Sequence, residues 1–437
     1  MTSATSVPTI KTFSLSKCEI KMKKLMILLV TALLFGACGS NDDNDEIPKE
    51  AERTVLIYIA ADNNLSPLAD LDLEELKEGS KKLGKQQNLI VFVDLANTTL
   101  SYIARIKDGV LLDSTSMTGI NAADPAILEE MLRYTRETYP AKSYGLGLWG
   151  HSNGWVMVKD TVTYARSRAY GQDNGQDKSY WMNIPSMARA IANGMGNDKL
   201  RFIFADCCNF ACIESAYELR NVTDYLIGSP AEIPEPGAPY HLIIPTLFNT
   251  SETFYESVIN TYYDFYSEGF IAHPGYYFNK TSGDLAGYSV PLSVIKSAEL
   301  DNLAQETARL LGTIYDKLTP EGSLNSSDAL AYGCQWDVKY HIDMFHILSL
   351  NTAESDFNNW KSAFLRAVPY RHFSQKWLTI FPWLKNNMDK YNMKEDECGM
   401  VSMFFPNPIF KSTNGNWNTE IRSFQWNDVI RWQDYGW

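Results

Sequence analysis

The segment S-Y-G-L-G-L-W-G-H (143–151) decides the fold, because an apolar run of strand length ends there at a glycine and a histidine. A second apolar run, L-R-F-I-F-A-D-C-C (200–208), ends at an aspartate and two cysteines. Strands that are apolar throughout are typical of sheets covered by helices on both faces. The two segments therefore predict neighbouring core strands that each end in residues able to do chemistry.

The flanking sequence extends this pattern in both directions. Further buried strands are predicted at 54–61, 88–95 and 225–229, a hairpin at 101–117, and helices at 65–83, 124–138, 184–195 and 214–221. Residues 159–180 are predicted to form a long polar loop, and the chain after about residue 240 is rich in helix, with strand-like pieces at 288–295 and 400–405. Strands that alternate with helices indicate an α/β fold with a mostly parallel sheet flanked by helices.

His151 and Cys208 each follow the end of a predicted core strand, and one predicted helix connects the two strands. A right-handed crossover places such strands side by side, about 4.8 Å apart, with active residues beyond their carboxyl ends. A cysteine peptidase needs a thiol, an imidazole and backbone N–H donors for the oxyanion. We expect the strand-to-helix turn at Cys208 to supply exposed N–H groups near a helix N-terminus, an environment that would also lower the pKa of its thiol.

The cysteine count favours a thiol with a chemical role. After residue 38, where the N-terminal leader described below is predicted to end, the chain has five cysteines, at positions 207, 208, 212, 334 and 398. An odd number leaves at least one thiol outside any disulfide in a monomer, and an unpaired thiol in an exported chain is a candidate nucleophile. No C-x-x-C or H-E-x-x-H motif occurs, so no metal site is predicted. The alternative is that these cysteines and His151 are core residues without a catalytic role.

Composition narrows the class of protein further. The chain has 437 residues, 45% of them hydrophobic and 13% aromatic, which is enough to build one large or two ordinary domains. The net charge of −13 argues against nucleic-acid binding and against a basic membrane-surface role. We expect a monomer.

The N-terminus predicts export. Lys21, Lys23 and Lys24 precede an apolar stretch of 13 residues, Leu25–Ala37, which is too short to span a bilayer and is typical of a secretory signal. Cys38 follows Gly36 and Ala37 as in a lipobox, so it is predicted to be the lipidated first residue of the mature chain. We therefore expect residues 1–38 to be leader and 39–52 an acidic tether, with the protein anchored to a bacterial outer membrane or cell surface. The alternative is an ordinary signal peptide with an incidental cysteine.

Several sequence blocks together resemble the clostripain family of cysteine peptidases, the relatives of caspases, legumains and gingipains. They are T-V-L-I-Y-I-A-A-D-N-N-L (54–65), Y-G-L-G-L-W-G-H-S-N-G-W (144–155), Y-G-Q-D-N-G (170–175) with the helix after it, F-I-F-A-D-C-C-N-F-A-C-I-E-S-A-Y-E-L (202–219) and E-C-G-M-V-S-M-F-F-P (397–406). The family's cysteine precedes a glutamate by six residues, and Glu214 therefore selects Cys208 over Cys207.

The resemblance implies a caspase-like fold, with a catalytic domain at 53–296 that residues 297–437 complete. It implies that Cys208 and His151 form the catalytic dyad, and that the backbone N–H groups of Ser152 and Cys208 hold the oxyanion. Asp206 would supply an acidic S1 pocket, with cleavage of peptide or protein substrates after arginine or lysine; the alternative is that Asp206 only fixes the active-site turn. No cofactor is expected, and a calcium requirement cannot be read from the sequence.

Two further points follow from the resemblance. Family members often mature by self-cleavage, and the candidate cut sites are Lys159, Arg166, Arg168 and Lys178. The family's His-Gly pair is His151-Ser152 here, and the Cβ of Ser152 could restrict the turn. The alternatives to a peptidase are therefore an inactive surface-binding relative and an esterase or transpeptidase that uses the same dyad.

Overall fold

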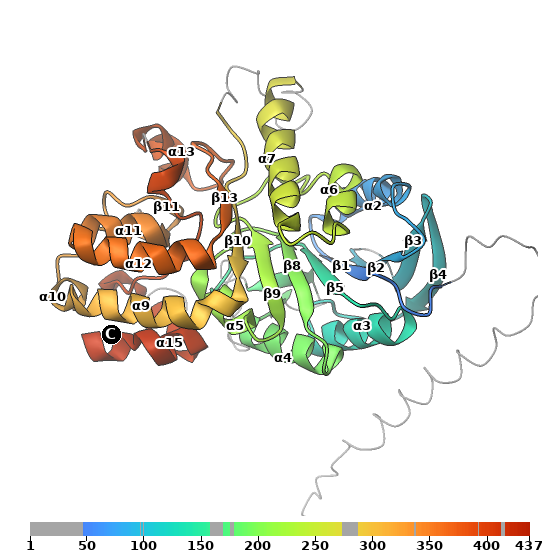
Figure 1. Cartoon of the computed structure of the whole chain (residues 1–437), viewed down its shortest axis with the longest axis horizontal. Helices are drawn as coiled ribbons and strands as arrows, with labels where there is room; N and C mark the ends of the chain where they lie inside the picture. The colour runs from blue at the N-terminus through green and yellow to red at the C-terminus, as the bar shows by residue number, and fades with distance from the viewer. Residues whose placement is uncertain are drawn as a thin grey trace, which may run out of the picture. The chain divides into compact units, whose positions relative to one another are not determined.

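The apolar runs of the sequence form the centre of one sheet (Figure 1). In the described part of the chain its nine strands lie in the order β13-β10-β9-β8-β5-β1-β2-β3-β4. The strands are β1 (Arg53–Ala61), β2 (Gln87–Leu95), β3 (Ser101–Lys107), β4 (Val110–Met117), β5 (Tyr144–Trp149), β8 (Leu200–Asp206), β9 (Thr223–Gly228), β10 (Leu292–Lys296) and β13 (Tyr370–His372). The five strands from β9 to β2 are parallel, and the outer pairs are antiparallel. The predicted mostly parallel sheet is confirmed.

The computed structural model describes residues 47–96, 98, 100–157, 169–174, 179–272, 287–335, 338–391, 393–411 and 416–437. Residues 48–437 form one unit by their contacts, so the predicted catalytic domain and the C-terminal region share it. The predicted leader and Cys38 lie outside the described residues. Among the helices that are described, none has the length and apolar character needed to cross a membrane.

Helices cover both faces of the central sheet, as Figure 1 shows. On one face lie α2 (Ser66–Ser80), α6 (Tyr240–Leu247) and α7 (Phe254–Ala272), and on the other α3 (Pro125–Thr138), α4 (Ile184–Met195) and α5 (Ile213–Leu219). Every second residue of β1, from Val55 to Ala61, packs with α2, α6 and α7 in one large apolar cluster. The residues between them are also buried, on the other face of the sheet. This burial on both faces explains why the sequence of β1 is almost continuously apolar.

Local signals explain where elements start and turn. Asp124 accepts a hydrogen bond from Ala126 N and caps α3, whose first residue is Pro125. Asp108 and Gly109 both have positive φ, at 50° and 84°, as a tight two-residue hairpin turn requires. These elements agree with the sequence prediction.

The C-terminal region adds a second sheet, β11 (Ala331–Gln335), β12 (Val338–Asp343) and β14 (Ser402–Met403), in the order β11-β12-β14. Its helices are α9 (Leu300–Gly312), α10 (Tyr315–Leu318), α11 (Met344–Asn351), α12 (Glu354–Ala367), α13 (Pro382–Asn387), α14 (Trp417–Glu420) and α15 (Gln425–Ile430). A β-bridge joins Cys212 to Ser402, and Ser402 N donates to Ala211 O at 3.0 Å. The second sheet thus reaches the segment that follows Cys208.

The prediction of a long polar loop at 159–180 is wrong at residues 170–174 and 179–180, and residues 159–168 and 175–178 lie outside the described part of the chain. β6 (Tyr170–Asn174) and β7 (Ser179–Met182) form a two-stranded sheet there. Tyr170 is fully buried, and its hydroxyl donates to the backbone oxygens of Tyr58 and Trp149 at 3.3 and 3.2 Å. The polar sequence of β6 is therefore stabilised by tertiary contacts rather than by local propensity.

Candidate active site

The two predicted catalytic residues leave the sheet from neighbouring strands. β5 and β8 pair in parallel, and Trp149, the last residue of β5, lies opposite Asp206, the last residue of β8. His151 is two residues beyond Trp149, and Cys208 is two residues beyond Asp206. The structure therefore brings both residues to the same edge of the sheet, where parallel α/β folds place their active sites.

Cys208 differs from the other cysteines in its exposure. Among the described cysteines, which form no disulfide, Cys208 is half-buried and the other four are buried. Burial raises the pKa of the adjacent Cys207 thiol well above its ordinary value, and the thiol is hydrogen-bonded to the Ser152 side chain. Because a nucleophile must be accessible and able to ionise, the geometry favours Cys208 over Cys207.

Cys208 precedes α5 in the chain but does not lie in the first turn of that helix. α5 begins at Ile213, and Cys212 is its N-cap. Between Cys208 and the helix the chain turns through Asn209, whose φ is 57°, and pairs with the segment after β9. These bonds are Asn209 N to Ala231 O and Ala211 N to Ser229 O, both at 2.9 Å. The argument from a helix dipole for a lowered thiol pKa therefore does not apply.

A residue outside the predicted site orients His151. Its Nε2 lies 2.9 Å from Oδ1 of Asn64, which belongs to the turn after β1. An amide oxygen can only accept, so this contact fixes the tautomer with hydrogen on Nε2. In the neutral ring the lone pair then lies on Nδ1, the nitrogen that can take a proton. The ring of Trp181 in β7 lies 6.4 Å away, centroid to centroid.

Ser152 fits the position where the family has glycine. Its side chain is 6% exposed, and its Oγ accepts from Gly154 N at 3.1 Å. It is not among the described residues with positive φ, so the Cβ causes no strain in the turn. Gly171 N donates to His151 O and Asn153 N to Ala169 O, which makes Ser152 and Tyr170 a non-hydrogen-bonded pair. The N–H of Ser152 therefore points away from β6.

Asp206 is buried beneath the predicted site with three donors around it. Its Oδ2 accepts from Ala238 N at 3.0 Å and from the Tyr240 hydroxyl at 2.9 Å, and its Oδ1 accepts from the Tyr262 hydroxyl at 2.9 Å. The side chain is 2% exposed. Burial raises the pKa of Asp206 to about 6, although the three hydrogen bonds oppose the shift. Asp206 thus holds the turn at 234–240 against the end of β8.

A second buried carboxyl group lies close to Asp206. Asp72, from α2, accepts a hydrogen bond from Trp149 Nε1 at 2.6 Å and is 3% exposed. Burial, and next the charge of Asp206, raise the pKa of Asp72 to about 9. One face of the sheet end therefore carries two acidic side chains, one of which is neutral at pH 7.

Glu214 links the segment after Cys208 to the C-terminal region. It is fully buried in the first turn of α5, and its Oε1 accepts from Phe404 N at 2.8 Å. Burial raises its pKa to about 7. Glu214, whose spacing from Cys208 matches the family's cysteine and glutamate, therefore contacts the segment at 397–406.

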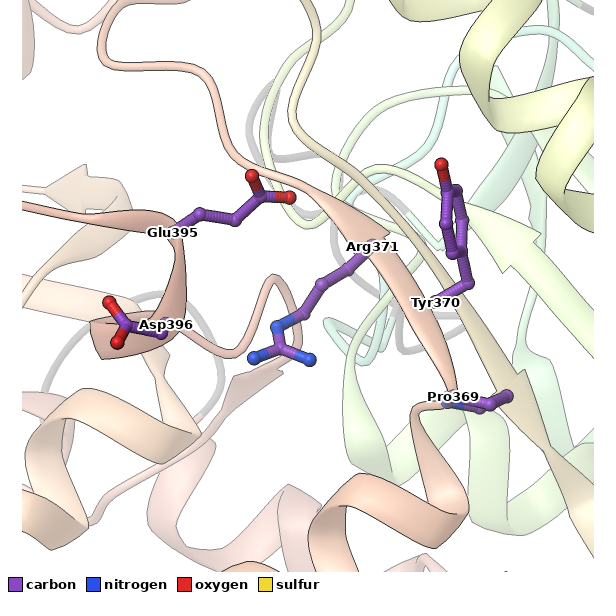
Figure 2. A pocket seen from close by; sticks show the side chains of 5 residues that line it. All are labelled: Pro369, Tyr370, Arg371, Glu395 and Asp396. Atoms are coloured by element: carbon purple, nitrogen blue, oxygen red, sulfur yellow. The ribbon is translucent and has the colours of Figure 1, made fainter.

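The four candidate self-cleavage sites lie outside the described residues. In the described part of the chain, no cluster of three or more histidine, cysteine or acidic side chains is arranged to hold a metal ion. A cavity of about 370 Å³ lies at edge strand β13, lined by Pro369, Tyr370, Arg371, Glu395 and Asp396 (Figure 2). None of the predicted site residues lines this cavity, so it carries no argument about the dyad.

Three residues near the dyad were not predicted from the sequence. Asn64 contacts His151, and Asn153 lies between the segment of Cys208 and His341 of β12. Asn64 and Asn153 both belong to sequence blocks that resemble the clostripain family, but neither spacing nor composition gives them a role. His341 is 188 residues from Asn153, and no local pattern marks that contact.

The mostly parallel sheet flanked by helices is a caspase-like fold, and a half-buried cysteine and a histidine bonded to Asn64 lie at the ends of two neighbouring strands. A model of the clostripain family, peptidase C11, matches residues 57–433. The chain belongs to this family, and the resemblance found from the sequence is confirmed.

Comparison with individual relatives agrees with this assignment. The clostripain of Hathewaya histolytica is 25% identical over 223 residues, which are 45% of this chain and 42% of that protein. The match thus spans less than half the length of that curated relative.

Two solved structures cover more of the chain. A secreted C11 cysteine protease from Bacteroides thetaiotaomicron, in complex with an irreversible peptide inhibitor, has a TM-score of 0.69 and 26% identity, covering 88% of this chain and 100% of its own. An inactive zymogen C11 protease from Parabacteroides distasonis has a TM-score of 0.66 and 25% identity, and the match covers 88% of this chain and 99% of that protease.

Proposed function

We propose that the protein hydrolyses peptide bonds with Cys208 as nucleophile and His151 as its acid–base partner. The observation that carries the proposal is the position of the two residues, each two residues beyond paired strand ends, with Cys208 the one described cysteine that is not fully buried. The family assignment supports the same chemistry.

The proposed reaction has two steps. The Cys208 sulfur attacks the peptide carbonyl carbon, its proton passes to Nδ1 of His151, and the oxyanion accepts from the N–H groups of Ser152 and Cys208. The imidazolium then gives that proton to the leaving amine, which leaves an acyl-enzyme thioester. Water, deprotonated by the neutral imidazole, hydrolyses the thioester and restores the thiol. Asn64 would keep the imidazole in the tautomer that this sequence of steps requires.

We further propose cleavage after arginine or lysine, with Asp206 as the acidic group of the S1 pocket. A carboxylate can accept about four hydrogen bonds, and three are in use, so one remains for a substrate N–H. Because Ala238 N donates to Oδ2 and the side chain is 2% exposed, the turn before α6 has to move to admit a basic side chain.

Processing and location are also proposals. Self-cleavage at Lys159, Arg166, Arg168 or Lys178 would cut the chain between the segments of His151 and Cys208. The C11 protease from Bacteroides thetaiotaomicron is a secreted protein, and we propose from the N-terminal sequence that this chain is exported as a monomeric lipoprotein anchored through Cys38.

The test compares Cys208→Ala with Cys207→Ala on fluorogenic peptides that carry arginine, lysine, aspartate or a neutral residue at P1. Cleavage that survives Cys207→Ala and vanishes in Cys208→Ala supports the proposal. Asp206→Asn should then reduce cleavage after basic residues more than after neutral ones. If none of the peptides is cleaved by intact or deliberately nicked protein, the chain is an inactive relative, and ester turnover alone would indicate an esterase.

A further inference from the structure

We propose that Asn153 and His341 are positioning residues that hold the histidine segment and the cysteine segment of the site in register. The inference rests on the proposed function, because it assigns a role toward the dyad. Asn153 is two residues after His151, and Asn209 directly follows Cys208. His341 comes from β12 of the second sheet, far from both in the sequence.

Asn153 is the point where three parts of the chain meet. Its Oδ1 accepts from Asn209 Nδ2 at 3.2 Å and lies 3.1 Å from Nε2 of His341. Its side chain is also hydrogen-bonded to Tyr340. The backbone of Asn153 is held by its N–H, which donates to Ala169 O at 3.0 Å. One amide side chain therefore ties the residue after the nucleophile to β12.

The hydrogen bonds of His341 have a definite direction. Asn153 Oδ1 can only accept, so Nε2 of His341 carries the hydrogen. Nδ1 then accepts from the Ser402 hydroxyl at 3.3 Å. Both His341 and Ser402 are fully buried. Burial lowers the pKa of His341 to about 3, so the ring is neutral and cannot serve as an acid or base near pH 7.

The two segments pack directly against one another at Gly154. Gly154 has a φ of 59°, and a Cβ there would lie 2.4 Å from Asn209 O and 3.3 Å from the His341 ring. The backbone after His151 therefore touches the backbone after Cys208, with no space for adjustment. A change in His341 is transmitted through Asn153 to both catalytic segments. Shifts of about 1 Å in such geometry can cost about 100-fold in rate.

The test uses His341→Leu, which removes the N–H donor, and His341→Gln, which keeps a donor toward Asn153. His346→Gln in α11 is the matched control, since His346 bonds Leu330 N and does not contact Asn153. For each variant kcat and KM are measured on the best peptide. The rate of Cys208 alkylation is followed against pH by peptide mass mapping, and folding is checked by thermal unfolding.

For His341→Leu we expect kcat to fall by about 10- to 100-fold with little change in KM. The midpoint of Cys208 alkylation should move to higher pH, because a displaced imidazolium would stabilise the thiolate less. His341→Gln should keep a kcat and a Cys208 alkylation midpoint close to those of the wild type, and His346→Gln should resemble the wild type. If His341→Leu does not fold, Asn153→Ala, at a half-buried position, should show the same loss.

The proposal is overturned if folded His341→Leu keeps the wild-type kcat and alkylation profile, or if His341→Gln loses as much as His341→Leu. The alkylation profile also separates this proposal from the proposed function. If the wild type cleaves no peptide, the peptidase assignment fails, whereas an altered Cys208 profile in His341→Leu would still establish the positioning role.

Discussion

Trp149 and Asp206 lie opposite one another at the ends of β5 and β8, and each is followed two residues later by a predicted catalytic side chain. This register sets the spacing of His151 and Cys208, because parallel strands are about 4.8 Å apart. Both residues also act on Asp72: Trp149 donates a hydrogen bond to it, and the charge of Asp206 raises its pKa. The strand ends thus position the proposed dyad and the candidate S1 carboxylate together.

Cysteine reactivity should follow burial. In the native protein a small charged alkylating agent is expected to modify Cys208 within minutes and to leave Cys207, Cys212, Cys334 and Cys398 unmodified, because the latter are at most 3% exposed. Peptide mass mapping after timed quenching measures this. Equal labelling of Cys207 and Cys208 would contradict the assignment.

Gly154→Ala should damage both stability and activity. Its positive φ alone costs about 1–2 kcal/mol, and the overlap with Asn209 O adds a further 1–3 kcal/mol or so. Gly119→Ala is the matched control, because Gly119 has a φ of 63° and open space around its Cβ position. Thermal unfolding and kcat of both variants should show a much larger loss at position 154; equal losses would mean that the contact is unimportant.

Asp72 should make the protein less stable as the pH rises. Its folded pKa of about 9 lies above the unfolded value of 3.8, so between these pH values only the folded state retains the proton. The free energy of unfolding therefore decreases with increasing pH, by up to about 1.4 kcal/mol per unit from this group. Asp72→Asn should flatten that slope in denaturant unfolding from pH 5 to 8, whereas Asp70→Asn, exposed on the same helix, should not. An unchanged slope in Asp72→Asn would refute the assignment.

A cut within the candidate processing region should leave the protein assembled. In the sequence, β5 precedes that region and β8 follows it, and the two strands pair along their length. Gly171 N also donates to His151 O, and Asn174 N donates to Asp62 O, at 2.9 and 2.8 Å. After limited proteolysis the two fragments should elute together in size-exclusion chromatography and separate only in denaturant. Separation in native buffer would contradict this pairing.

The sequence predicted the central sheet well because its strands are buried on both faces. β1 and β8 are continuous apolar runs, and their lengths and ends agree with the prediction within about two residues. The β6 strand was missed because its residues are polar. Asp173 of β6 is buried, and with Asp94 of β2 it accepts from Ala122 N, a contact that local sequence does not reveal.

The candidate site was predictable only in part, because some of its contacts join segments that are far apart in the sequence. Strand ends and order in the chain indicated His151 and Cys208. The start of α5 was predicted to within one residue, but Cys208 lies outside its first turn, because the bridge from Cys212 to Ser402 extends the chain before the helix begins. His341 was missed because its contact with Asn153 depends on how the second sheet packs against the first.

The most direct test of Cys208 as the nucleophile is to treat the protein with a peptidyl chloromethyl ketone that carries lysine at P1 and to map the adduct by mass. We predict one adduct, on Cys208, with loss of peptidase activity in proportion to labelling, and no adduct after Cys208→Ala. An adduct on Cys207, or full peptidase activity after complete labelling of Cys208, would contradict it.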